Sequence, residues 1–311
     1  MKQLSIIIPI FNEEQILPEL FLRVTDAAKS ITFDYELIFV NDGSKDKSID
    51  ILKQFSKEDE NVKYIDFSRN FGHQIAVTAG LDYSSGQAVV IIDGDLQDPP
   101  ELIPEMYEKY KEGYPVVYAK RKERKGETPF KKLTAKLFYR ILQKLTSIDI
   151  PLDTGDFRLI DRKVVDNLKK MTEQNKFLRG QIAWMGYKST YVEFIRDERR
   201  FGNTGYPLSR MVKFAIDGIT GFSNKPLVYV RNMGILVSIF AFLIMLYALY
   251  SYFILERVIT GWTSMIVASM FIGGIQLLSI GIIGEYIGRI NTDVRNRPLY
   301  FINESNIKQE N

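Results

Sequence analysis

Residues 88–101 read AVVIIDGDLQDPPE, a short apolar run that passes directly into an acidic turn. Asp93 and Asp95 are two positions apart, so their side chains point the same way in extended backbone, and Gly94 permits a tight turn between them. Two hard oxygen ligands at one strand end suit Mg²⁺ or Mn²⁺ held together with phosphate oxygens. A bare D-x-D is also common as a solvated turn, but the preceding strand and the following Gln97 favour a metal site.

Short β-branched or aromatic runs of this kind recur along the first 120 residues, with helically spaced stretches between them. The runs are Leu4–Ile10, Tyr35–Val40, Val62–Phe67, Ala88–Ile92 and Pro115–Ala119. This alternation predicts an α/β fold with a mainly parallel sheet covered by helices on both faces. Ligands of such sheets bind beyond the carboxyl ends of the strands.

Polar turns follow the first four of these runs. They read PIFNE at 9–13, NDGS at 41–44, SRNFGH at 68–73 and DGDLQD at 93–98. We expect them to lie together at one edge of the sheet. Asp42 offers a carboxylate to a uracil or ribose, although the NDGS string taken alone is better explained as an ordinary turn. Residues 153–159, DTGDFRL, place two carboxylates and an arginine around a further expected turn.

Composition excludes several chemistries. The chain has no cysteine and one histidine, so disulfides, thiolate catalysis and Cys-ligated zinc are excluded, and a Ser-His triad is disfavoured. His73 begins an expected helix, and lone histidines serve surface or packing roles more often than catalysis. The net charge of +3 is too small to indicate nucleic acid, and we expect no such partner.

Two stretches in the last third of the chain, 233–254 and 263–288, are almost free of charge. Each exceeds the roughly 20 apolar residues that span a bilayer, whereas a buried core helix is usually shorter and more polar. Their short link predicts a hairpin. Arginines flank its outer ends, so the positive-inside bias places the preceding domain and both termini in the cytoplasm. Glu285, the charge within the second span, is expected to form a helix-end pair with Arg289 rather than an intramembrane site.

The expected organisation is a domain over residues 1–205, a juxtamembrane amphipathic segment over 206–230, the hairpin over 231–290 and a tail over 291–311. Basic clusters at 120–125 and 196–213 suit either phosphate capture or a solvated surface. Amphipathic stretches at 130–145 and 208–219 suit either a helix in the membrane interface or one packed on the sheet.

Seven motifs occur in order along the chain: FNEE (11–14), NDGS, SRNFGH, DGDLQDPPE, TGDFRL (154–159), NKFLRG (175–180) and GIIGEYIGRI (281–290). Their combined order resembles the family 2 glycosyltransferases that act on polyprenyl phosphates. It is most similar to the bacterial two-span bactoprenol glucosyltransferases and is also similar to the dolichol-phosphate mannose synthases. The resemblance covers nearly the whole chain. The Q-x-x-R-W element of processive polysaccharide synthases is absent, and the nearest string is QIAW at 181–184.

The resemblance implies a GT-A catalytic domain, an inverting mechanism and roles for particular residues. Nucleotide-sugar contacts fall to Pro9, Asn12, Glu13, Asp42, Asp93 and Gly94. The metal ligands would be Asp93, Asp95 and Gln97. Asp156 and Asp95 would be the catalytic residues, with Asp156 at the reacting centre. Phosphate and acceptor contacts fall to Arg121, Arg124, Arg200 and Tyr206. Gly205 departs from the basic residue expected beside Tyr206, which puts one acceptor contact in doubt.

The implied reaction moves a hexose, most simply glucose from UDP-glucose, onto undecaprenyl phosphate, with Mg²⁺ or Mn²⁺ as cofactor. It would take place at the cytoplasmic face of a bacterial inner membrane and serve cell-envelope glycan modification. Alternatives are UDP-GlcNAc, GDP-mannose or a UDP-aminoarabinose derivative as donor, an inactive membrane-bound binding subunit, and an interaction protein that assembles a transporter. Glycines at 273–288 suggest close helix packing, either within the hairpin or in a homo-oligomer such as a tetramer.

Overall fold

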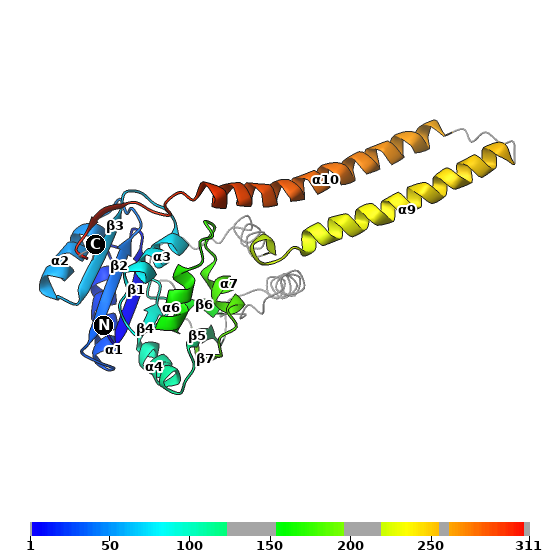
Figure 1. The fold of residues 1–311 in the computed structure, drawn as a ribbon. Helices are drawn as coiled ribbons and strands as arrows, with labels where there is room; N and C mark the ends of the chain where they lie inside the picture. The colour runs from blue at the N-terminus through cyan, green and yellow to red at the C-terminus, as the bar shows by residue number, and fades with distance from the viewer. Residues whose placement is uncertain (1, 123–153, 196–218, 255–260, 308–311) are drawn as a thin grey trace.

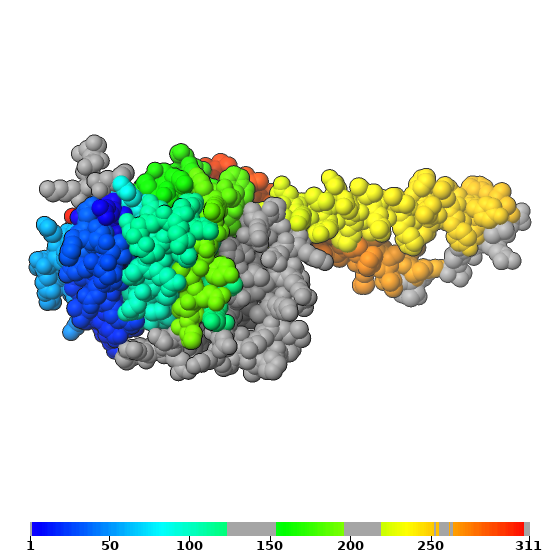
Figure 2. Space-filling view, turned by 90° about the horizontal axis from the view of Figure 1, so that it is seen from below, coloured from blue at the N-terminus to red at the C-terminus, as the bar shows by residue number. Residues whose placement is uncertain are grey.

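The computed structural model describes residues 2–122, 154–195, 219–254 and 261–307 of the chain. In these residues a sheet-based domain is joined to two long helices that extend away from it (Figure 1). Seen from a second direction, the helices again project as a narrow arm from the rounded domain (Figure 2).

One mixed sheet organises the described part of the domain, with strand order β7-β5-β6-β4-β1-β2-β3-β8. The strands are β1 Leu4–Ile10, β2 Tyr35–Asn41, β3 Val62–Phe67, β4 Ala88–Ile91, β5 Val116–Arg121, β6 Thr154–Asp161, β7 Ser189–Phe194 and β8 Ile302–Ser305. The four central strands β4, β1, β2 and β3 are parallel to one another. Strand β6 is antiparallel to both its neighbours, and β8 is antiparallel to β3. The expected mainly parallel α/β sheet is confirmed.

Helices cover both faces of the sheet. They are α1 Leu17–Lys29, α2 Ser48–Glu58, α3 His73–Tyr83, α4 Ile103–Lys111, α6 Arg162–Lys169 and α7 Leu178–Trp184, with a 3₁₀ turn η1 at Pro100–Leu102. All seven residues of β1 are buried, and successive ones serve opposite faces. Ile6 and Ile8 pack in the core shared with α1, α2 and α4, whereas Ile7 packs with α3, α6 and α7. Burial on both faces explains the continuous apolar strands.

The long helices are α9 Lys225–Phe253 and α10 Trp262–Arg295. Both are long and apolar enough to cross a membrane, with mean hydropathies of 2.3 and 2.2, and their apolar windows are not buried in the protein. The helices run alongside each other as the two arms of a hairpin (Figure 1). Glu285 pairs with Arg289 Nε at 3.3 Å, the helix-end pair that the spacing favours.

After α10 the chain returns to the domain and adds β8 to the sheet. Tyr300 stacks on Phe67 with ring centroids 5.0 Å apart, and its hydroxyl donates to Asp82 at 3.0 Å. Glu304 on β8 accepts a hydrogen bond from the Tyr64 hydroxyl and pairs with Lys53. Residues 302–305, expected as part of a tail, are therefore an integral strand that covers the edge of β3.

Candidate active site

The turns after β1 and β2 are joined by hydrogen bonds from backbone N–H groups to side-chain oxygens. Asn12, with φ of +56°, donates its backbone N–H to Ser44 Oγ at 2.9 Å and accepts from the Lys45 N–H at 2.8 Å. Glu13 N–H donates to Ser48 Oγ at 3.1 Å. Pro9, near the end of β1, lies opposite Val40 of β2. The expected gathering of the strand ends is thus present, and the nucleotide-sugar contacts assigned to Pro9, Asn12 and Glu13 stay predictions.

Asp42 holds the next turn in place. Its carboxylate is buried and accepts from the backbone N–H of Phe71 at 2.7 Å and of Gly72 at 3.0 Å. Burial raises the pKa of this carboxyl, against the lowering effect of the two N–H donors. Gly72 has a φ of +104°, which a side chain would strain. The role of Asp42 toward a nucleotide stays a prediction; what the structure shows is a clamp on the residues that precede His73.

The DGD turn lies against the end of β1. A Cβ added to Gly94 would come within 2.6 Å of Ile10 Cδ1 and 3.0 Å of the Pro9 carbonyl oxygen, so a side chain here would crowd the end of β1. Leu96 is buried with a φ of +54°, and the Gln97 N–H donates to Asp95 Oδ1 at 3.1 Å. This local geometry places Asp93 and Asp95 at the same sheet edge as the first two turns.

Asp156 lies in a cluster of cations. Its Oδ1 accepts from Arg158 Nη2 at 2.7 Å and is 3.6 Å from Arg179 Nη2, while Oδ2 is 3.7 Å from His73 Nδ1. Arg158 is only 1% exposed and also donates to the carbonyl oxygens of residues 155 and 156. Burial opposes ionisation of Asp156, but Arg158, Arg179 and His73 together lower its pKa to about 2. The site therefore holds a carboxylate that is ionised at neutral pH.

Residues 154–159 form part of strand β6 and not the expected turn, so that expectation was wrong. The TGDFRL string contains turn-forming residues, but pairing with β4 on one side and β5 on the other stabilises extended backbone. The strand conformation has a direct consequence for the site. Asp156 and Arg158 are two positions apart and so share one face of the sheet.

His73 joins this cluster to the DGD turn, a role that reasoning from sequence missed. Its Nε2 is 2.8 Å from Asp93 Oδ1, and its side chain is 40% exposed. Burial opposes protonation, but Asp93 and Asp156 raise the pKa of the imidazole to about 9. No role was assigned to His73 from sequence because a lone histidine is seldom catalytic. The available signal was its place in a polar turn directly after a parallel strand.

Arg121 stands at the end of β5, next to the cluster. It is 3.6 Å from the buried carboxylate of Asp98, and its Nη2 would lie 2.8 Å from a Cβ added to Gly155. Its expected phosphate contact stays a prediction. Arg124, Arg200, Gly205 and Tyr206 lie outside the described residues, as do the amphipathic stretch 130–145 and all but the last residue of 208–219.

The donor set at the DGD turn fits a divalent cation that is shared with a substrate. Among the described residues no three His, Asp or Glu side chains form a complete metal site. Asp93 and Asp95 offer carboxylates, and Gln97 offers an amide oxygen. Mg²⁺ is commonly held by one or two carboxylates, with the remaining positions filled by substrate phosphates and water.

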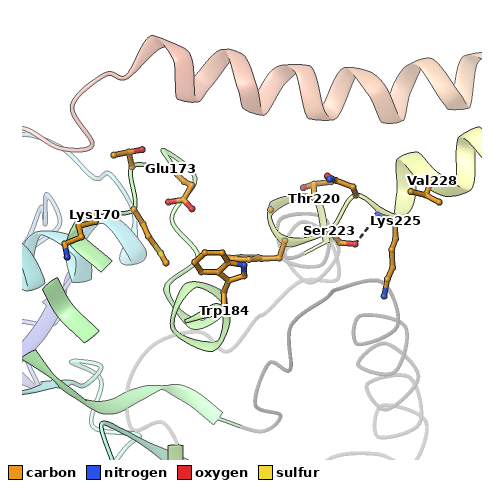
Figure 3. Close-up of a pocket in the computed structure, with 12 residues that line it drawn as sticks. Lys170, Glu173, Trp184, Thr220, Ser223, Lys225 and Val228 are labelled. Carbon is orange, nitrogen blue, oxygen red and sulfur yellow. Dashed lines mark hydrogen bonds between the residues drawn. The ribbon is translucent and has the colours of Figure 1, made fainter. Parts of the chain in front are cut away.

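A groove of about 800 Å³ lies between the domain and the start of α9 (Figure 3). Lys170, Glu173 and Trp184 line it from the domain, and Ser223, Lys225 and Val228 line it from the segment that enters the first long helix. Helix α7 connects the groove to the Asp156 cluster, which is Asp156 with Arg158, Arg179 and His73. Arg179 in its first turn contacts Asp156, and Trp184 at its last position borders the groove.

Comparison with known proteins agrees with this architecture. The family model described as Glycosyl transferase family 2 matches residues 5–169. The chain is 56% identical over 303 residues to the uncharacterized glycosyltransferase YkcC of Bacillus subtilis, covering 97% of this chain and 94% of that protein.

Two further relatives are named for a specific transfer. The SfII prophage-derived bactoprenol glucosyl transferase of Shigella flexneri is 38% identical, covering 97% of this chain and 98% of the relative. A prophage bactoprenol glucosyl transferase homolog of Escherichia coli is also 38% identical, covering 96% and 98%. The chain therefore belongs to family 2 of the glycosyltransferases, and it is a glycosyltransferase with a GT-A catalytic domain.

Proposed function

We propose that this enzyme transfers a hexose from a nucleoside diphosphate sugar to a polyprenyl phosphate at the cytoplasmic surface of a bacterial inner membrane. Glucose from UDP-glucose and undecaprenyl phosphate form the proposed pair, and the product serves modification of cell-envelope glycans. The observation that carries the proposal is the similarity to bactoprenol glucosyl transferases over 97% of the chain, which includes both carboxylate motifs and the hairpin.

The donor diphosphate would lie at the DGD turn. Asp93, Asp95 and Gln97 are the residues that would hold Mg²⁺ or Mn²⁺ there. When bound, such a cation supplies Lewis-acid screening of the diphosphate leaving group. Asp93 and Asp95 come directly after the buried strand β4, so the backbone that carries these two carboxylates is fixed before the donor binds.

Asp156 would act as a fixed negative charge beside the reacting carbon. General bases work best with a pKa near the operating pH, and the lowered pKa of Asp156 makes it a weak base. A phosphate monoester has its second pKa near 6, so the acceptor is already an anion at neutral pH. An acceptor oxygen attacks the anomeric carbon as the bond to the diphosphate breaks, with inversion. No proton needs to move, and Asp156 stabilises the positive charge that develops on the sugar.

The acceptor would approach along the groove beside α9. Lys170 and Lys225 offer positive charge to a phosphate, and Trp184 is 62% exposed, as suits the water–lipid interface. Trp184 is five positions beyond Arg179 in α7, a rise of about 7.5 Å along the helix. A head group in the groove is therefore within reach of the Asp156 cluster.

We also propose that the domain and both termini lie in the cytoplasm and that the protein forms a homo-oligomer. Both ends of the hairpin adjoin the one domain in Figure 1, which supports a domain and termini on the same, cytoplasmic side. A Cβ added to each glycine at 273, 274, 281, 284 and 288 would meet nothing within 4 Å. These small residues leave α10 open to close packing by a second copy, which supports a homo-oligomer.

The test is a donor screen with the purified full-length enzyme in detergent or lipid nanodiscs. Undecaprenyl phosphate, Mg²⁺ and one nucleotide sugar at a time are incubated, and the lipid product is identified by mass spectrometry. We expect hexosyl-phosphate lipid from UDP-glucose. Product from UDP-GlcNAc, GDP-mannose or a UDP-aminoarabinose derivative instead would change the donor but retain the reaction. Absence of glycolipid with every donor would refute the proposal.

A further inference from the structure

We propose that His73 is a positioning residue that fixes the Asp93 carboxylate for the cation and ties it to the carboxylate at the reacting centre. This inference rests on the proposed function, because it assigns the cation to Asp93. It gives a role to a residue outside the DGD motif, one that contacts both Asp93 and Asp156.

The backbone before His73 is fixed by a buried carboxylate. Asp42 accepts from the Phe71 and Gly72 N–H groups, and Asn70 Nδ2 donates to the Asp42 carbonyl oxygen at 3.1 Å. Gly72 then turns the chain with a φ of +104°, and His73 begins α3. The carbonyl oxygen of Gly72 accepts the first helical hydrogen bonds, from Ile75 and Ala76. The direction of the imidazole is therefore set by buried structure and not by a free loop.

His73 uses one oxygen of Asp93. A carboxylate only accepts, so the imidazole Nε2–H donates to Oδ1 across 2.8 Å. In the proposed arrangement Asp93 Oδ2 is the oxygen that would ligate the cation. Carboxylates that ligate a metal are commonly held by such a hydrogen bond, which selects the ligating oxygen and orients its lone pair.

Gln74 extends the connection to Asp156 and α7. Its Nε2 is 3.2 Å from Asp156 Oδ2 and 3.4 Å from His73 Nδ1, while its Oε1 accepts from the Leu178 N–H at 3.2 Å. Leu178 begins the helix that brings Arg179 to Asp156. The first two residues of α3 therefore link the strand ends of β3 and β4 with β6 and α7. A displacement of Asp93 is transmitted to Asp156 through two side chains.

The test compares three substitutions that separate the two imidazole nitrogens. Glutamine places an amide nitrogen three bonds beyond Cβ, as Nε2 is, whereas asparagine places one two bonds beyond Cβ, as Nδ1 is. His73→Gln thus retains the donor to Asp93, and His73→Asn and His73→Ala lose it. Tyr300→Phe is the matched control, because it removes a hydrogen bond to Asp82 near the opposite end of α3.

Binding is measured on the full-length protein in detergent by titrating Mn²⁺ in the presence of UDP and following the electron paramagnetic resonance of free Mn²⁺. We expect a 10- to 100-fold weaker Mn²⁺ affinity for His73→Ala and His73→Asn, the range for second-sphere changes. His73→Gln should stay within about 3-fold of wild type, the criterion for rescue by the retained donor. Tyr300→Phe should leave the affinity unchanged, and melting temperatures check that each variant is folded.

Unchanged Mn²⁺ affinity in folded His73→Ala would overturn the inference, and so would equal loss in the glutamine and alanine variants. Wild-type protein that binds no Mn²⁺ with UDP would overturn it as well, even if glycolipid is made. Wild-type protein that binds Mn²⁺ with UDP but makes no glycolipid refutes the proposed transfer instead, and the comparison of His73 variants remains valid. The two failures are thereby distinguished.

Discussion

Replacing Asp156 by asparagine tests whether this residue acts through its charge. The change keeps the shape of the side chain and one acceptor oxygen for Arg158 but removes the negative charge from among three cations. A unit charge about 4 Å from a developing positive charge, at an effective dielectric constant near 20, is worth about 4 kcal/mol. Turnover should therefore fall about 10²- to 10³-fold, as when a preorganised charge or dipole is removed from other enzymes.

The same substitution should also cost stability. Arg158 is 1% exposed and loses its partner charge, and removing one member of a buried pair costs about 3–5 kcal/mol. The amide still accepts a hydrogen bond, and two backbone carbonyl oxygens still contact Arg158. We therefore expect a loss of about 1–3 kcal/mol in the free energy of unfolding, since the hydrogen bonds are retained and the charge is not.

The assay follows glycolipid formation from pH 6 to 9 with both substrates saturating. In wild type and Asp156→Asn alike, an acidic limb near pH 6 should report ionisation of the acceptor phosphate. The folded pKa of Asp156 lies below this range, so its own protonation adds no limb. The loss should thus be uniform from pH 6 to 8. Nearer pH 9 the imidazole of His73 also titrates, and removing the charge of Asp156 lowers its raised pKa. Asp161→Asn on the same strand is the matched control, because it also removes one carboxylate charge while its amide oxygen can still accept from the Lys163 N–H as the N-cap of α6.

Two results would refute this reasoning. Turnover of folded Asp156→Asn within a few-fold of wild type would show that the charge contributes little. A loss that disappears at high pH would show that Asp156 removes a proton after all.

Three further predictions concern stability, packing and the cation. Glu36 is fully buried, which raises the pKa of its carboxyl, but its hydrogen bonds with Lys63, Ser5 and Ser85 outweigh burial and hold this pKa below its ordinary value. Glu36→Gln should therefore lower the free energy of unfolding by about 2–4 kcal/mol at pH 7. The difference from wild type in thermal unfolding should shrink as the pH falls below about 4.5, where the wild-type carboxylate becomes protonated. An undiminished difference at pH 3 would contradict that sign. Gly94→Ala places a Cβ against Ile10 and Pro9 and should lower Mn²⁺ affinity with UDP at least about 10-fold, with thermal unfolding little changed; unaltered binding would show that the turn can shift at no cost. Chelation by EDTA, or Asp95→Ala, should abolish glycolipid formation, and undiminished product would remove the cation from the mechanism.

Much of the sheet could be predicted because its central strands are encoded locally. Leu4–Ile10 and Val62–Phe67 were predicted with the bounds that the structure shows, since continuous β-branched runs are typical of strands buried on both faces. The hairpin helices extend beyond the predicted spans, to Lys225 and Arg295, because their polar ends remain helical.

Strands β6, β7 and β8 could not be predicted from local sequence, because they pair with strands that are distant along the chain. Strand β6 contains turn-forming residues and is extended only between β4 and β5. Strand β8 is four residues long and pairs with a strand more than two hundred positions earlier. The same limit applies to the site. Asp93 and Asp156 were predicted from motifs, but the contact of His73 with both follows only from the order of strands.

The pairing of β8 with β3 also dictates when the domain can be finished during synthesis. Ribosomes build chains from the N-terminus, so residue 302 emerges only after α9 and α10 have been made. Until then the edge of β3 lacks the strand that pairs with it. Once residues 302–305 have been made, β8 pairs with β3 and covers that edge. A chain that stops before residue 302 would therefore leave the backbone N–H and C=O groups at the edge of β3 without these partners.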